Sequence, residues 1–306
     1  MPRLQKRRRA LAEPAQKQYA KCRAYAKVNL SLNISGTRGG YHLIDSVAAS
    51  VDLFDEVVAR PRRDTLVNVY MRGMGSESIP PEENNAVRAG EAFVSALGTC
   101  GADIQIRKNI PLGAGLGGSS ADAAGVLNAM AKLYGADGEE LVPLAAACGS
   151  DTPYMLGGGF ARLSGRGERV ERLPLRRTFH MLLLLPEGGT SAAACYKKYD
   201  EAPDPLRADS ARLWAALAHG GFADVCENVY NALGAPACAL HAGTAEALAL
   251  ARSLSPAACA VTGSGSGVFA LFETEELCRW AQGHCKNKKK LRTLVVRTLQ
   301  PRGTGG

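Results

Sequence analysis

A dense run of glycines between a short strand and a helix constrains the fold of this chain more than any other feature. The run reads Lys108-Asn-Ile-Pro-Leu-Gly-Ala-Gly-Leu-Gly-Gly-Ser-Ser-Ala-Asp-Ala-Ala-Gly125. We expect a strand to end near Arg107 and a helix to extend from Ser119 to Tyr134. Glycine is the most costly residue to order, so this many glycines in one turn indicate a close approach of the backbone to an anion or a neighbour.

The glycine-rich loop is predicted to hold phosphate through backbone N–H groups and the positive end of the following helix. Ser119 is expected to cap that helix, and Asp122 three residues later to complete a capping box. A Walker A loop matches less well, because no lysine follows the glycines. A dinucleotide-binding loop needs an acidic residue at the end of a second strand, whereas Asp137 and Glu139 follow a helix. A plain glycine turn is the remaining alternative.

Strand and helix patterns come in clusters along the chain, which favours an α+β fold over a strictly alternating one. Roughly 150 residues per domain is usual, so 306 residues predict two units, at 21–170 and 175–300, after a basic extension at 1–20. The charged segment 164–179 is the expected junction. Strands are expected at 28–34, 47–58, 66–70, 104–106, 156–163, 180–185 and 292–299, a hairpin at 261–272, and helices at 84–97, 119–134, 139–148, 207–219 and 236–253.

The positive charge of the chain is concentrated at its two ends. Residues 1–20 carry +5 and residues 286–306 carry +7 against a total of +8, so the body between them carries −4. Solvated basic ends are therefore favoured over a specific nucleic-acid site. No apolar run approaches the roughly 20 residues that a membrane span needs, since the longest, Met181–Leu185, is the size of a strand.

The cysteines predict reduced thiols and a cytoplasmic location. Nine cysteines are scattered without a C-x-x-C pair, and the group Cys278, His284 and Cys285 is only a weak metal signal, so no metal site is predicted. The first residues lack the apolar core of a signal peptide. They also lack serine and threonine before Ser31, which argues against an organellar transit peptide.

Several further motifs, taken with the loop, resemble a known enzyme family. Pro111–Ala121 resembles the ATP loop of the GHMP small-molecule kinases. Four other segments resemble motifs of the branch that acts on 4-diphosphocytidyl-2-C-methyl-D-erythritol. They occur in the same order as in that family and, with the loop, span residues 24–270. These four segments are Ala24-Tyr-Ala-Lys-Val-Asn-Leu-Ser-Leu32, Gly39-Gly-Tyr-His-Leu43, Gly149-Ser-Asp-Thr-Pro-Tyr154 and Val261-Thr-Gly-Ser-Gly-Ser-Gly-Val-Phe269.

The resemblance implies a GHMP kinase fold, with an ATP-binding N-terminal subdomain, a C-terminal subdomain and a catalytic cleft between them. It implies ATP-dependent phosphorylation of the 2-hydroxyl of the cytidyl diphosphate substrate, with Mg²⁺, in non-mevalonate isoprenoid biosynthesis. Small molecules are the expected partners, and the chain is expected to be a monomer or a homodimer. Two alternatives remain: a sister kinase acting on homoserine or a mevalonate-like acid, and a catalytically silent binding protein of the same fold.

The resemblance also assigns Asp151 as general base and Lys27 as its electrostatic partner. Taken alone, Asp151 has the pattern of an ordinary helix N-cap, and Lys27 that of an exposed strand lysine. Alternation along the strand places Lys27 on one face with Tyr25 and Asn29. Retention of both residues argues against a silent binding protein.

The remaining site residues follow from the same motifs. Tyr41 and His42 are expected to stack on and hydrogen-bond the cytosine ring. The family usually has a threonine where Ala192 stands, so Ser191 or Thr190 is expected to replace that contact. The predicted substrate-binding residues are Asn29, Tyr41, His42, Ser191, Gly263 and Ser264. The predicted ATP-binding residues are Asn84, Pro111, Gly113, Gly115, Leu116, Gly117, Gly118, Ser119 and Ser120.

Overall fold

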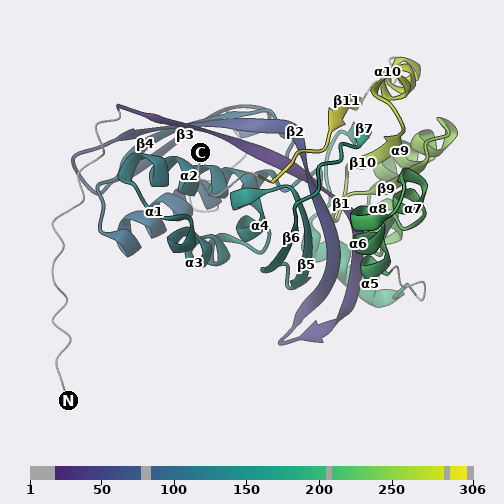
Figure 1. Cartoon of the computed structure of the whole chain (residues 1–306), viewed down its shortest axis with the longest axis horizontal. Coiled ribbons are helices and arrows are strands. Elements are labelled where there is room, and N and C mark those ends of the chain that lie inside the picture. The colour runs from purple at the N-terminus through teal and green to yellow at the C-terminus, as the bar shows by residue number, and fades with distance from the viewer. Residues whose placement is uncertain (1–17, 77–83, 205–208, 286–289, 302–306) are drawn as a thin grey trace.

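The computed structural model describes residues 18–76, 84–204, 209–285 and 290–301. Within these ranges the chain forms two sheets with helices packed around them, which confirms the predicted α+β class (Figure 1). Most of the predicted basic extension, and the residues after 301, lie outside the described residues. Ala20, assigned to that extension, is instead the buried first residue of a strand.

The larger sheet has seven strands, with five in the order β3-β4-β2-β1-β8; β5 pairs with β2, and β6 pairs with β5. Strands β1 and β2 form a long antiparallel hairpin that runs across much of the molecule (Figure 1). The other edge of β2 is shared, because residues 56–61 pair with β4 and residues 44–49 pair with β5. The strands are β1 (Ala20–Arg38), β2 (Tyr41–Pro61), β3 (Val67–Gly73), β4 (Ala102–Lys108), β5 (Phe160–Gly165), β6 (Arg169–Leu173) and β8 (Tyr230–Asn231).

The helices beside this sheet are α1 (Asn85–Leu97), α2 (Gly118–Tyr134), α3 (Gly138–Cys148) and α4 (Thr152–Gly157). Helix α2 lies at their centre and packs against β1 and β2 (Figure 1). Its small residues permit this close packing, since a Cβ atom on Gly125 would lie 2.8 Å from the side chain of Val57. A capping box of Asp137 and Glu140 begins α3, as helix-start chemistry favours.

The smaller sheet is antiparallel throughout, in the order β11-β7-β10-β9. Its strands are β7 (His180–Pro186), β9 (Ala258–Val261), β10 (Val268–Phe272) and β11 (Leu291–Arg297). The helices of this half of the chain are α5 (Ala192–Glu201), α6 (Ser210–His219), α7 (Phe222–Glu227), α8 (Gly234–Leu240), α9 (Ala242–Ser253) and α10 (Glu275–His284).

Strand β7 joins two hydrophobic cores through its alternating side chains. Leu183 and Leu185 belong to the core beneath the larger sheet, whereas Leu182 and Leu184 belong to the core around α8, α9 and α10. Successive side chains of a strand point to opposite faces, so the continuous leucine run is buried on both faces. A strand that is covered on both faces needs apolar side chains at every position, which accounts for the unbroken run of leucines.

Several elements differ from the prediction. The predicted junction at 164–179 contains β6, and the predicted strand 156–163 begins with the last turn of α4. The predicted helix 236–253 is two helices, because His241 ends α8 and caps α9 by accepting the N–H of Thr244. Helices α5, α7 and α10 were not predicted.

Candidate active site

The glycine-rich loop connects β4 to α2 and is packed against the turn between β9 and β10. Gly113, Gly115 and Gly117 have φ angles of 66°, 70° and 72°, the left-handed region that glycine favours. A Cβ atom on Gly115 would lie 2.0 Å from the carbonyl oxygen of Thr262. Ser266 donates its backbone N–H to the carbonyl oxygen of Gly113 at 2.9 Å. The loop is therefore held closely on one side and has little room for side chains.

The capping box predicted for α2 is wrong. Gly117 occupies the N-cap position, and among the described residues no side chain caps this helix. Ser119 lies in the first turn, where its hydroxyl accepts a hydrogen bond from the side chain of Asn85 at 2.9 Å. Asp122 is buried and forms an ion pair with Lys108 instead. The backbone N–H groups at the start of α2 therefore lack a side-chain cap, and such groups can bind an anion.

Lys27 and Asp151 form an ion pair across the cleft, with 3.4 Å between Nζ and the nearer carboxylate oxygen. Lys27 is 5% exposed, so it is not an exposed strand lysine. Its Nζ also donates to Oδ1 of Asn29, which is held by a 2.8 Å bond to Ser46. Asp151 precedes α4 without capping it, and its side chain remains 28% exposed. Neither ordinary interpretation of these two residues therefore fits.

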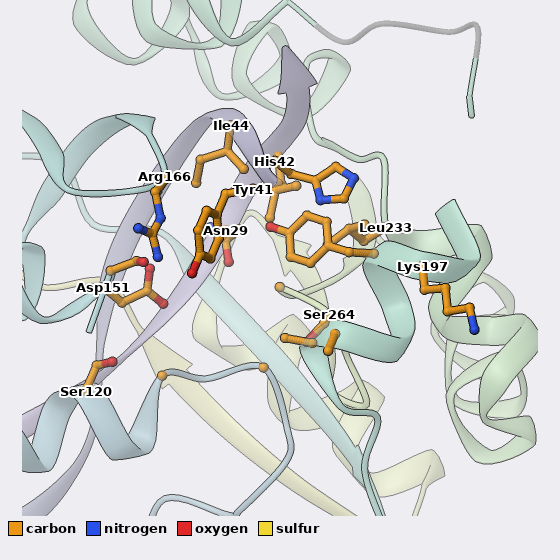
Figure 2. Close-up of a pocket in the computed structure, with 18 of the residues that line it drawn as sticks. Asn29, Tyr41, His42, Ile44, Ser120, Asp151, Arg166, Lys197, Leu233 and Ser264 are labelled. Carbon is orange, nitrogen blue, oxygen red and sulfur yellow. The ribbon is translucent and has the colours of Figure 1, made fainter. Parts of the chain in front are cut away.

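A single cavity of about 690 Å³ collects most of the predicted site. Figure 2 shows Asp151 and Ser120 on one side of it and His42, Leu233 and Lys197 on the other. The turn after β9 closes one wall, where Asn231 of β8 donates to the carbonyl oxygens of Val261 and Gly263. The predicted residues that line the cavity are Lys27, Asn29, Tyr41, His42, Gly115, Gly117, Ser120, Asp151, Gly263 and Ser264.

The other predicted site residues lie nearby in different surroundings. Asn84 caps α1 and accepts the N–H of Ala86 at 3.0 Å. Ser191 caps α5, and its hydroxyl oxygen accepts the N–H of Ala194 at 3.0 Å. Pro111 lines a separate hollow with Leu112 and Gly188. The carbonyl oxygen of Leu116 accepts the backbone N–H of Lys27. Gly113 belongs to the glycine-rich loop, and Gly118 and Ser119 begin α2.

The sequence interpretation missed five polar residues of the cavity: Ser150, Arg166, Tyr196, Lys197 and Asp200. The ring of Tyr196 stacks on His42 with 4.7 Å between ring centroids, and Asp200 lies 2.7 Å from Nε2 of His42. Burial raises the pKa of Tyr196 to about 12, so its hydroxyl stays protonated. Tyr196, Lys197 and Asp200 belong to α5. Its serine cap and alanine-rich first turn were the available signals.

Arg166 lies at the entrance of the cavity, on the turn between β5 and β6. Its guanidinium group lies 3.7 Å from the ring centroid of Tyr41, which is 54% exposed (Figure 2). One face of that ring is therefore covered by a cation, and a planar ligand would have to approach the other face.

These groups suit the transfer of a phosphoryl group to an alcohol. Such a transfer requires a cradle for phosphates, a cation against the developing charge and a carboxylate beside the hydroxyl. The loop, Lys27 and Asp151 could supply one of each within a single cavity.

The described ranges contain no group of three or more His, Cys, Asp or Glu side chains placed to hold a metal ion. No helix in the described part of the chain is both long and apolar enough to cross a membrane.

Comparison with known proteins identifies the family. Residues 84–159 match the model of the GHMP kinases N terminal domain. The 4-diphosphocytidyl-2-C-methyl-D-erythritol kinase of Pelotomaculum thermopropionicum is 34% identical over 283 residues, covering 91% of this chain and 98% of the relative. The enzyme of that name from Streptomyces coelicolor is 37% identical over 254 residues, covering 79% of this chain and 84% of the relative.

Solved structures agree with the sequence relatives. A crystal structure of 4-(cytidine 5'-diphospho)-2C-methyl-D-erythritol kinase matches with a TM-score of 0.74 and 30% identity, covering 91% of this chain and 98% of that one. A homoserine kinase from Cytophaga hutchinsonii matches with a TM-score of 0.73 at 19% identity, covering 96% and 99% of the two chains, and so shows the shared fold alone.

Proposed function

This chain belongs to the GHMP kinases, in the branch of the 4-diphosphocytidyl-2-C-methyl-D-erythritol kinases, and we propose that it acts on that cytidyl alcohol. It is an ATP-dependent small-molecule kinase. In the proposed reaction the 2-hydroxyl of the substrate receives the γ-phosphoryl group of ATP. The products are the 2-phosphate and ADP, and the reaction belongs to isoprenoid precursor biosynthesis.

One observation carries this proposal: the glycine-rich loop, the Lys27–Asp151 pair and an aromatic group share one cavity. The aromatic group consists of Tyr41, His42 and Tyr196. A kinase for a small acid such as homoserine needs the first two features alone. The third feature suits a substrate that also carries a nucleobase, because Tyr41 and Tyr196 offer ring faces and His42 offers a polar edge. A volume of about 690 Å³ suits a nucleotide-sized ligand.

Asp151 acts in this proposal as the general base. Its carboxylate takes the proton from the 2-hydroxyl, directly or through one water, while the hydroxyl oxygen attacks the γ-phosphorus. The bond between that phosphorus and the bridging oxygen breaks, and ADP leaves with the electron pair. The partial exposure of Asp151 beside a buried cation supports this role, since the carboxylate is both held and accessible.

Lys27 acts electrostatically. A buried ammonium group interacts more strongly than one in water, so Lys27 stabilises the negative charge that develops on the hydroxyl oxygen. Asn29 orients it by accepting one of its three hydrogens. The backbone N–H groups at the start of α2 take the phosphates, which the positive end of the helix further stabilises.

The donor groups at the loop are compatible with Mg²⁺ bound mainly through the nucleotide. Mg²⁺ prefers oxygen ligands and usually retains waters and substrate phosphates in kinase sites. The hydroxyl of Ser120, in the first turn of α2, lines the same cavity and is the protein oxygen beside the loop that would hold it. The ion would neutralise charge on the phosphates; the protein residues then supply orientation and proton transfer.

The experiment that tests the function measures ADP release with purified protein, ATP and Mg²⁺. The cytidyl substrate should give turnover well above the rate measured without an alcohol. Homoserine at the same concentration should give no increase, because it has no base for the aromatic group to bind. Turnover on homoserine, without turnover on the cytidyl substrate, would make the protein a sister kinase of the same family.

A further inference from the structure

Three buried charged residues lie beneath the glycine-rich loop, outside the cavity and unused by the proposed reaction. Lys108, the last residue of β4, has a fully buried side chain. Its Nζ donates to the carboxylates of Asp55, on β2, and Asp122, on α2. Burying three ionisable side chains is costly, and a tightly packed apolar group of similar volume often stabilises a core equally well. The cluster therefore calls for an explanation beyond stability.

Asp55 binds the beginning of the loop. Its Oδ1 accepts the backbone N–H groups of Asn109 and Ile110, at 2.5 and 2.8 Å, while its Oδ2 accepts from Lys108. Asn109 adds a second tie to the same strand, since its side chain donates to the carbonyl oxygen of Phe54 at 2.9 Å. The first two residues of the loop are thus fixed to β2.

Asp122 and Lys108 hold the end of the loop. Asp122 lies in α2 soon after Gly117, where the helix begins, and Lys108 Nζ lies 3.7 Å from the position that a Cβ atom on Gly118 would take. Lys108 thereby links the carboxylate that holds the beginning of the loop to the carboxylate that follows its end. The cluster therefore connects the beginning of the loop to the helix that follows it.

We infer that Asp55, Lys108 and Asp122 are positioning residues that hold the glycine-rich loop in its nucleotide-binding shape. Glycines leave the loop with many accessible conformations, so ATP would otherwise have to order it on binding. Fixing both ends beforehand removes part of that cost and appears as tighter nucleotide binding. This inference rests on the proposed function, because it takes the loop to be the site of the ATP phosphates.

The test compares three variants by titration with the Mg²⁺ complex of a non-hydrolysable ATP analogue. Asp55→Asn replaces a charged acceptor and should raise the Kd about tenfold. Asn109→Ala removes only the second, half-buried tie and should raise the Kd about threefold. Leu133→Ala, at the buried far end of α2, destabilises the same helix and should leave the Kd unchanged. At saturating ATP, kcat should stay within about twofold of the parent for both loop variants.

Hydrogen exchange distinguishes an error in the proposed ATP site from an error in the positioning role alone. If the analogue does not slow exchange at residues 113–120 in the unaltered protein, the proposed ATP site is wrong. If it does, and both loop variants keep the Kd of Leu133→Ala, only the positioning role is wrong. Should Asp55→Asn not fold, Asp122→Ala decides the matter, because it removes the contact at the end of the loop and keeps the Asp55–Lys108 pair. An unchanged Kd in that variant would rule out the positioning role.

Discussion

At the scale of single residues, the active site depends on a lysine that the fold has buried beside one carboxylate. Lys27 has two polar partners, Asn29 and Asp151, and both line the cavity. A buried cation of this kind is stable only while its partners remain. The two side chains therefore act as a unit, and substituting either one removes the ion-pair partner of the other.

Asp151→Asn should lower kcat by about two to four orders of magnitude, because an amide accepts no proton from the hydroxyl. Nucleotide affinity should change little, since the phosphates are bound by the loop. ADP release under saturating conditions gives kcat, and calorimetric titration gives the affinity. Asp52→Asn is the matched control: Asp52 pairs with Arg297 away from the cavity, and its loss should leave kcat unchanged. An equal loss of binding and turnover at Asp151 would mark it as structural.

Tyr41→Ala should raise the KM for the cytidyl substrate by about ten- to a hundredfold, the usual contribution of stacking on a base. The KM for ATP should remain as it is, because Tyr41 lies away from the loop, at the side of the cavity with Arg166. Steady-state kinetics with each substrate varied in turn separates the two constants. Tyr70→Ala removes an equally exposed tyrosine from β3 and should alter neither KM. A change in the KM for ATP alone would contradict the assignment of the base pocket.

The structure brings together predicted site residues that lie in local motifs, and it contradicts a predicted cap whose side chain has a distant partner. Lys27, Asp151 and the loop glycines are contained in short motifs, and the structure brings them together. The Ser119–Asp122 spacing imitates a capping box, but Asp122 binds Lys108 on another element. A local pattern cannot reveal such a partner, because the contact forms only when β4 packs beside α2.

At the scale of elements, the contact between the glycine-rich loop and the β9–β10 turn joins the two sheets at the cavity. Gly115→Ala adds a methyl group that would meet the carbonyl oxygen of Thr262 in a backbone conformation that alanine disfavours. We expect raised KM values for both substrates and a lower melting temperature. Gly135→Ala is the control, since its φ of 72° carries the same strain with no atom within 4 Å.

The comparison of these two glycine variants separates strain from contact. Strain alone costs about 1–2 kcal/mol in either variant and should lower both melting temperatures by a similar amount. In Gly115→Ala the added methyl group should also displace the β9–β10 turn and so raise the KM values. Gly135→Ala should leave the KM values unchanged. Identical kinetics for the two variants would show that the contact between loop and turn is unnecessary for the reaction.

Strong periodicity and helix-end signals predicted some elements well but did not suffice for all of them. Helix α1 lies within one residue of the prediction, with Asn84 before it and Gly98 after it. Strand β6 is short and charged, so only its pairing with β5 makes it a strand. Helix α5 was missed despite its serine cap, and with it Tyr196, Lys197 and Asp200. The division into subdomains at 170–175 stays a prediction.

At the scale of the whole molecule, the buried cluster makes stability depend on pH. Desolvation, opposed by Lys108 and reinforced by Asp55, raises the pKa of Asp122 to about 8 from its ordinary value of 3.8. Those two residues, from β4 and β2, are the charged groups that face it. Between about pH 4 and pH 8 the folded protein keeps a proton that the unfolded chain releases. The unfolding free energy contributed by this group therefore falls as pH rises through that window.

Asp122→Asn should remove this dependence, because asparagine cannot ionise. We expect the melting temperature of the variant, relative to the parent protein, to rise from pH 5 to pH 8 and then to level off. Buried thiols do not disturb this window: burial raises the pKa of Cys195 and Cys226 to about 11, which lowers stability only above about pH 9. Differential scanning calorimetry of both proteins at pH 5, 6, 7 and 8 measures the difference. A difference that stays constant, or falls, over these four points would mean that Asp122 is already ionised in the folded protein, with Lys108 balancing its charge.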